Sequence, residues 1–173
     1  QVTVANVCYG STTILVPIRI VDRVAPVMVC DDKLVVTRDN LGNAKVAAVD
    51  VNEGSSDNCG PILWMKVRRP VGDCAASFMR MPRFVDANGN GKIDAYDPNS
   101  TKPQDYIDEN RNKVADELEY FRISTAGALM SPMLDSVPFF CCDPASVMVE
   151  LWGQDWMGKR SFCWNSITIA EKT

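Results

Sequence analysis

The chain has 173 residues, of which 46% are apolar, so it can bury the core of one good-sized domain. Its net charge of -4 and the lack of a basic patch argue against a nucleic-acid partner, and no apolar run is long enough to span a membrane. Histidine is absent, which removes the commonest general base and the commonest zinc ligand.

The first segment, residues 1–23, is predicted to form two β-strands, Val2–Val7 and Thr12–Val21, joined by a glycine-containing turn. Two strands cannot bury a core on their own. The end of the chain has the same order of strand, turn and long strand, and Ile18–Arg23 is similar to Ile167–Lys172. We therefore interpret residues 1–23 as the last two strands of a preceding immunoglobulin-like repeat.

The main domain is predicted to span residues 24–173 and to begin at a proline kink, Pro26. Apolar residues alternate between Ile62 and Arg69, so Leu63, Met65 and Val67 are expected to face the core. The other predicted strands are Val27–Cys30, Lys33–Thr37, Ala44–Val51, Val137–Phe140, Val147–Trp152 and Phe162–Ile169. About seven strands with short turns favour an all-β fold, an immunoglobulin-like β-sandwich.

An insertion at residues 75–130 interrupts this domain and carries a pattern suited to a hard cation. Oxygen-bearing side chains occupy positions 1, 3, 5, 9 and 12 of a twelve-residue calcium loop, and position 7 contributes its carbonyl. The candidate ligands are Asp86, Asn88, Asn90, the Lys92 carbonyl, Asp94 and Asp97. Gly91 at position 6 permits the sharp turn that this loop needs.

A second loop repeats the pattern. Its candidate ligands are Asp108, Asn110, Asn112, the Val114 carbonyl, Asp116 and Glu119. Lys113 replaces the glycine at position 6, which weakens the motif. The insertion is therefore expected to bind two Ca²⁺ ions. The alternative is an acidic, solvated linker in which Asp and Asn serve only as turn residues.

The first loop resembles those of dockerins and EF-hands, and the pair resembles thrombospondin type 3 calcium repeats. Neither flank of the first loop has a helical apolar stripe, and Pro98 directly follows it. These features predict a metal-nucleated loop, folded by its ions and mostly disordered without them, in place of a helix pair that opens on binding.

The chain contains seven cysteines and no CxxC pair, which favours disulfides over a zinc site. Disulfides together with loops suited to millimolar calcium indicate an extracellular protein, secreted or on a cell surface. Cys141 and Cys142 are adjacent in a strand, so their side chains face opposite ways and need different partners. The expected pairs are Cys30–Cys163, Cys59–Cys142 and Cys74–Cys141, with Cys8 left for the preceding repeat. The connectivity stays open, because six cysteines allow fifteen pairings.

Five segments outside the insertion carry further motifs, among them Asp-Asn-Cys-Gly and Cys-Cys-Asp. The segments are Ala25–Asp32, Glu53–Gly60, Met65–Arg69, Phe139–Asp143 and Val147–Leu151. They resemble HYR-like immunoglobulin-type repeats, which recur in giant secreted surface proteins of Bacteroidota, including gliding adhesins and extracellular filament or hook proteins. The resemblance covers residues 25–173 apart from the insertion. It implies a tandem module of an elongated exported protein, secreted by the type IX route, without catalytic activity.

The sequence thus predicts a structural or adhesive repeat whose partners are neighbouring repeats and other copies in a homo-oligomer or filament. The alternative is a calcium-dependent glycan- or protein-binding module, and Trp152, Trp156 and Trp164 could either bind sugar or pack between domains. Three basic residues, Lys66, Arg68 and Arg69, could pair with acids of the insertion or of a neighbouring repeat. An enzyme is not expected, because no nucleophile motif is present.

Overall fold

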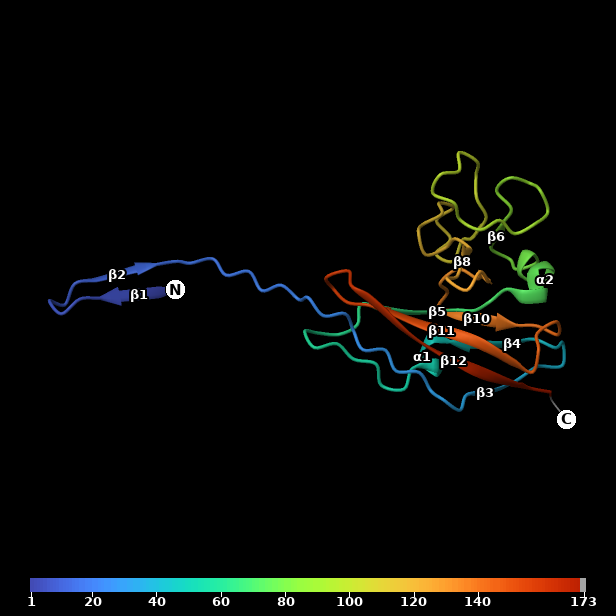
Figure 1. Ribbon diagram of the computed structural model, residues 1–173, viewed down its shortest axis with the longest axis horizontal. Helices are drawn as coiled ribbons and strands as arrows, with labels where there is room; N and C mark the ends of the chain where they lie inside the picture. Colours follow the sequence, from blue (N-terminus) through green and yellow to red (C-terminus); the bar gives the residue numbers. More distant parts are fainter. Residues whose placement is uncertain (172–173) are drawn as a thin grey trace.

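The computed structural model describes residues 1–171, which are mostly β-structure with few helical turns. Figure 1 shows a β-rich body from which an N-terminal hairpin projects on an extended connector. The hairpin consists of β1 (Val2–Ala5) and β2 (Ser11–Ile14), which pair antiparallel and are exposed at every residue. The second strand ends well before the predicted Val21, because the connector after Ile14 pairs with no other strand of the described chain.

A four-stranded sheet forms the larger part of the body. Its order is β3 (Val35–Thr37), β12 (Arg160–Ala170), β11 (Ser146–Gln154) and β5 (Trp64–Arg68). The central strand β11 runs antiparallel to both β12 and β5, whereas β3 is parallel to β12. The first strand of the body therefore lies beside its last.

A second, two-stranded sheet pairs β4 (Ala44–Ala47) with β10 (Ser136–Phe139), again antiparallel. The strand predicted over Ala44–Val51 stops at Ala47, and a helical turn, α1 (Ala48–Val51), follows it. The Asp50 carboxylate caps this helical turn, because it accepts the Ala47 N–H at 2.9 Å.

The two sheets and α1 share one core. Val67, Val149 and Leu151 from the large sheet and Val137 and Phe139 from the small sheet are fully buried in it. On β5 the predicted face is correct at Val67 and Met65, which pack into the core, whereas Leu63 lies before the strand and is 41% exposed.

The insertion stands on one side of the sheets (Figure 1) and has its own core. A 3-10 turn, η1 (Gly72–Cys74), leads into it, and its elements are α2 (Ala75–Met79), β6 (Phe84–Val85), β7 (Tyr106–Ile107), β8 (Arg122–Ile123) and β9 (Leu129–Met130). The buried residues of this second core are Val71, Cys74, Phe78, Ile107, Phe121 and Leu134. Hence the insertion is held by packing as well as by its polar loops.

A buried ion pair joins the two cores. Arg69, directly after β5, is 1% exposed and donates from Nη1 to Asp143 Oδ2 at 2.6 Å and to the Pro138 carbonyl at 2.8 Å. Its guanidinium carbon also lies 5.0 Å from the ring centroid of Phe139 in the first core and 5.5 Å from that of Phe78 in the second. The expectation that Arg69 pairs with an acid of the insertion or of a neighbouring repeat is therefore wrong, because Asp143 lies after the insertion in the same body.

Within residues 1–171, no helix combines the length and apolar character needed to cross a membrane.

Candidate functional site

The two candidate calcium loops start at opposite ends of one short β-ribbon. The first loop begins at Asp86, directly after β6, and the second begins at Asp108, directly after β7. Because β6 and β7 pair antiparallel, with Val85 opposite Tyr106, one short ribbon carries both loops.

Both loops have the same backbone path. Positions 4 and 6 adopt positive φ in each: 71° at Gly89 and 70° at Gly91 in the first loop, and 62° at both Arg111 and Lys113 in the second. A non-glycine residue costs about 1 to 2 kcal/mol in this region, so the surrounding contacts must hold Arg111 and Lys113 there. Lys113, which weakens the motif in sequence, does not change the path of the loop.

The first residue of each loop turns its carboxylate inward. Asp86 accepts the Gly91 N–H at 2.8 Å, and Asp108 accepts the Lys113 N–H at 3.1 Å. The other oxygen of Asp108, Oδ1, is buried and has no hydrogen-bond partner among the described residues. A buried carboxylate oxygen without a donor is costly, and a cation would satisfy it.

The side chains at positions 3, 5 and 9 of the first loop converge as well, as do those at positions 3 and 9 of the second. Asn88 and Asn90 each donate from Nδ2 to Asp94 Oδ2 at 2.6 Å, and Asn110 donates to Asp116 Oδ2 at 3.3 Å. The amide oxygen of each asparagine accepts a backbone N–H group two residues along, so these side chains must turn to direct their oxygens at an ion; amide and carboxylate oxygens are the ligands that calcium prefers.

Glu119 closes the second loop, as the motif predicts for position 12. It is 3% exposed, and it accepts the N–H of Glu109 at 2.9 Å and the N–H of Asp116 at 3.3 Å. These donors occupy positions 2 and 9, so the carboxylate joins the beginning of the loop to its end.

In the first loop this role belongs to Asp105. Asp105 is fully buried and accepts the N–H of Ala87 at 3.0 Å and that of Asp94 at 2.8 Å, which again occupy positions 2 and 9. Asp97, the predicted position 12, is exposed and accepts the N–H of Asn99 at 2.9 Å, two residues along. Loop spacing could not identify Asp105, because an intervening connection of unrelated length separates it from the motif.

The electrostatics around Asp105 also favour a cation. Burial raises the pKa of the Asp105 carboxyl; the N–H groups of Asp94 and Ala87 lower it in part, and the carboxylates of Asp86 and Asp94 raise it further. Several acidic oxygens are thus held together against their mutual repulsion. A divalent ion between them would remove that penalty.

An ion-pair network connects the second loop to the sheet. Lys66 on β5 contacts Glu109 at 3.0 Å and Asp135 at 2.8 Å, and the hydrogen bonds that its ammonium group donates to these carboxylates outweigh burial and raise the pKa of Lys66. The expected pairing of Lys66 with an acid of the insertion is confirmed. Arg68, in contrast, pairs within the sheet, with Glu150 at 2.6 Å.

The tryptophans do not form one cluster. Trp152 and Phe162 are opposite each other on β11 and β12 and stack at 4.6 Å, and Trp164 follows two residues along on the same face of β12, 63% exposed. Trp156 lies in the turn between these strands and is 66% exposed. Aromatic surface is therefore present on the outer face of the large sheet.

Residues 1–171 contain two disulfides. Cys30–Cys163 forms as expected, with a Cα–Cα distance of 5.8 Å, and its cysteines pack against the first core. The second bond is Cys74–Cys142, with a Cα–Cα distance of 5.5 Å, and it ties η1, which leads into the insertion, to the turn after β10. The expected pairs Cys59–Cys142 and Cys74–Cys141 are wrong.

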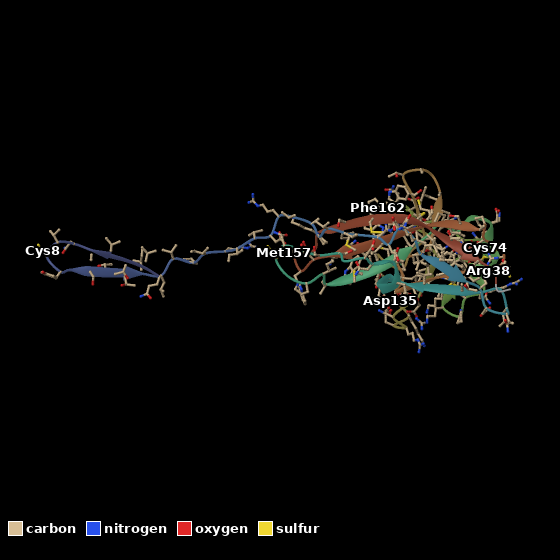
Figure 2. All side chains as sticks on the ribbon, turned by 90° about the horizontal axis from the view of Figure 1, so that it is seen from below. Cys8, Arg38, Cys74, Asp135, Met157 and Phe162 are labelled. Atoms are coloured by element: carbon tan, nitrogen blue, oxygen red, sulfur yellow. A yellow bond between two sulfur atoms is a disulfide. The ribbon has the colours of Figure 1, made fainter. Side chains whose placement is uncertain are left out.

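The position of Cys59 explains this difference. Cys59 lines a cavity with Met157, and Figure 2 shows Met157 at the end of the body nearest the connector, with Cys74 at the opposite end. Cys59 and Cys142 therefore cannot meet. Within the described chain Cys8, Cys59 and Cys141 form no disulfide.

A comparison of this chain with protein-family models, with curated proteins and with solved structures found no significant match, so the assignment of function rests on the geometry of these loops and sheets.

Proposed function

We propose that this chain is a structural or adhesive repeat of a secreted protein, an immunoglobulin-like β-sandwich whose inserted loops bind two calcium ions. The observation that carries the proposal is the close correspondence of the two loops in backbone path and hydrogen bonding, including positive φ at two matched positions of each loop. Turn-forming composition alone does not require two separate loops to share one pattern.

The strand order supports the sandwich. In immunoglobulin-like folds, strands C, F and G lie in one sheet and strands B and E in the other. Here β5, β11 and β12 correspond to C, F and G, and β4 and β10 correspond to B and E. The insertion then lies between C and E, where the fourth strand of such a fold runs. A loop at that place can change without breaking either sheet.

The ligands follow from the matched contacts. The first ion would be held by Asp86, Asn88, Asn90, the Lys92 carbonyl, Asp94 and Asp105, with Asp105 in place of Asp97. The second would be held by Asp108, Asn110, Asn112, the Val114 carbonyl, Asp116 and Glu119. When bound, calcium supplies positive charge that offsets the repulsion among these carboxylates and fixes the loop backbone.

The contacts of the insertion give these ions a mechanical role. The Lys66–Glu109 pair attaches the insertion to β5, and the buried Arg69–Asp143 pair and the Cys74–Cys142 disulfide hold the chain on both sides of it. Ordering of the loops would therefore stiffen the whole body. Two disulfides fit an oxidising, extracellular setting, and neighbouring repeats or other copies in a filament are the partners that such a module would contact.

Thermal unfolding of the oxidised chain in millimolar calcium and in chelator tests the proposal, with limited proteolysis followed in parallel. We expect calcium to raise the unfolding temperature and to protect the chain between Asp86 and Glu119, because an ion that binds only the folded state stabilises it. Superimposable melts and equal cleavage rates would contradict calcium binding by the loops and leave an acidic linker.

The exposed aromatic face favours a second candidate function, glycan binding. Trp152, Phe162 and Trp164 present ring surface on neighbouring strands, as sugar-binding platforms do. A glycan array with the wild-type chain and the Trp164→Ala variant distinguishes the two roles. Binding that disappears in the variant would support the platform, and no binding by either would leave the structural role alone.

A further inference from the structure

A second group of acids lies far from the insertion, where the N-terminal connector meets the body. Asp22 belongs to the connector, Asp57 to the loop before β5, and Asp155 to the turn between β11 and β12. One carboxylate oxygen from each lies within 4.8 Å of the others. Three segments distant in sequence therefore bring three negative charges to one point.

Local hydrogen bonds orient two of these carboxylates. Asp155 Oδ1 accepts the N–H groups of Met157 at 2.8 Å and Lys159 at 2.9 Å, and Asp57 Oδ2 accepts the N–H of Cys59 at 3.1 Å. Each bond fixes one oxygen within its own turn. The second oxygen of each residue is left free to face the cluster.

Those second oxygens have no donor. Asp155 is 1% exposed, and its Oδ2 is buried without a hydrogen-bond partner among residues 1–171; the same holds for Asp57 Oδ1. No lysine or arginine of the described chain forms an ion pair with any of the three acids. Buried carboxylate oxygens are normally paired, so this arrangement is costly as it stands.

The cluster opens onto a cavity of about 210 Å³, which Ile20, Trp156 and Met157 line together with the three acids and Cys59. The cavity has room for an ion with water ligands, and its apolar rim of Ile20, Trp156 and Met157 is exposed to solvent. A set of three carboxylates with one thiol and no histidine suits a hard cation better than zinc.

We propose that Asp22, Asp57 and Asp155 form a third calcium site, which fixes the connector to the body. Asp22 is 9% exposed, and its Oδ1 accepts the Val24 N–H at 2.9 Å, so the connector is already bent toward the cluster. Without an ion, the Asp22 carboxylate of the connector repels those of Asp57 and Asp155 in the body. A bound ion would attract all three. It would thereby set the direction in which the segment before Asp22 leaves the body, independently of the insertion.

Equilibrium dialysis with radioactive calcium tests the site by stoichiometry. We expect three ions for the wild type and two for both Asp155→Asn and Asp57→Asn, with the affinity of the lost site reduced at least about tenfold. Asn keeps the Oδ1 acceptor and the size of the side chain while removing the charge. The matched control is Asp31→Asn, from an acidic group with Asp32 and Glu53 that is more exposed and has no orphaned oxygen; it should still bind three.

A variant with Asp86→Ala and Asp108→Ala separates this proposal from that for the insertion. It should retain one ion, and that ion should disappear when Asp155→Asn is added. Unchanged stoichiometry in Asp155→Asn would overturn the third site, whatever the loops bind. A wild type that binds one ion, lost in Asp155→Asn, would support the third site while contradicting calcium binding by the insertion.

Trypsin cleavage gives an independent readout, since Arg19 and Arg23 flank Asp22 and are exposed. We expect calcium to slow cleavage at Arg23 severalfold in the wild type and in Asp31→Asn, and to have no effect on it in Asp155→Asn. Thermal unfolding in chelator controls for folding, because Asp155→Asn should then be at least as stable as the wild type. Calcium-independent cleavage at Arg23 in the wild type would overturn the role of the ion in holding the connector.

Discussion

Asp105 shows how one side chain can replace another in a recurring loop. Its two carboxylate oxygens accept N–H groups at positions 2 and 9 of the first loop, as those of Glu119 do in the second. A buried carboxylate in that position both closes the loop and adds negative charge. Asp97, at the expected position, has neither the burial nor these contacts.

The Asp105→Asn variant should therefore bind calcium at the first loop at least about tenfold more weakly, a loss of about 1.4 kcal/mol. Asp97→Asn is the matched control and should change the affinity by less than about threefold. Calorimetric titration in an Asp108→Ala/Asp155→Asn background isolates the first loop from the second loop and from the connector site. A larger loss in Asp97→Asn than in Asp105→Asn would show that the loop closes through the residue that the spacing rule selects.

At the scale of elements, the junction between the two cores depends on a buried charge pair. Arg69 and Asp143 have side chains 1% and 3% exposed, and the pair lies between the two cores. Both charges lost most of their hydration on folding, so each now depends on the other. The exposed pair between Arg160 and Glu117 joins the insertion to the large sheet, but water and salt screen it.

Asp143→Asn should lower the free energy of unfolding by about 3 to 5 kcal/mol, because it leaves the Arg69 guanidinium buried without a counter-charge. Arg160→Gln is the control for losing a link to the insertion at an exposed place and should cost about 0 to 1 kcal/mol. Urea denaturation in calcium measures both. Equal effects would mean that Arg69 finds another partner or water after the change.

The same elements show what the sequence could predict. Strands β5, β10, β11 and β12 could be predicted from the sequence, because apolar residues alternate along them and mark their buried faces. The second core was not, because irregular chain brings together residues with no common period, such as Val71, Phe78, Ile107 and Phe121. Likewise, loop spacing identifies ligands inside each loop, whereas Asp105 and Arg69 acquire their roles from neighbours distant in the sequence.

The whole molecule consists of three parts with different means of support. The sheets share one core closed by the Cys30–Cys163 bond, the insertion has a second core tied on by Cys74–Cys142, and the hairpin projects with its residues exposed (Figure 1). Figure 2 places Cys8 at the far end of that hairpin, away from both cores. Removing each disulfide should therefore destabilise a different part of the molecule.

The two disulfides close segments of 133 and 68 residues, and loop-closure entropy differs by only about 0.6 kcal/mol for a doubling of length. Removing either bond should thus lower the free energy of unfolding by a similar amount, about 2 to 5 kcal/mol, but in different parts of the molecule.

The Cys30→Ser/Cys163→Ser variant should lower the temperature of the main thermal transition, since both cysteines pack against the first core. The Cys74→Ser/Cys142→Ser variant should chiefly speed proteolysis within residues 75–130, because the sheets keep their own core. Cys59→Ser, which removes a cysteine without a disulfide partner in the described chain, should change neither measurement. If both double variants lost the main transition equally and showed the same cleavage, the two cores would unfold as one cooperative unit, and the insertion would be an integral part of the body instead of an attachment to it.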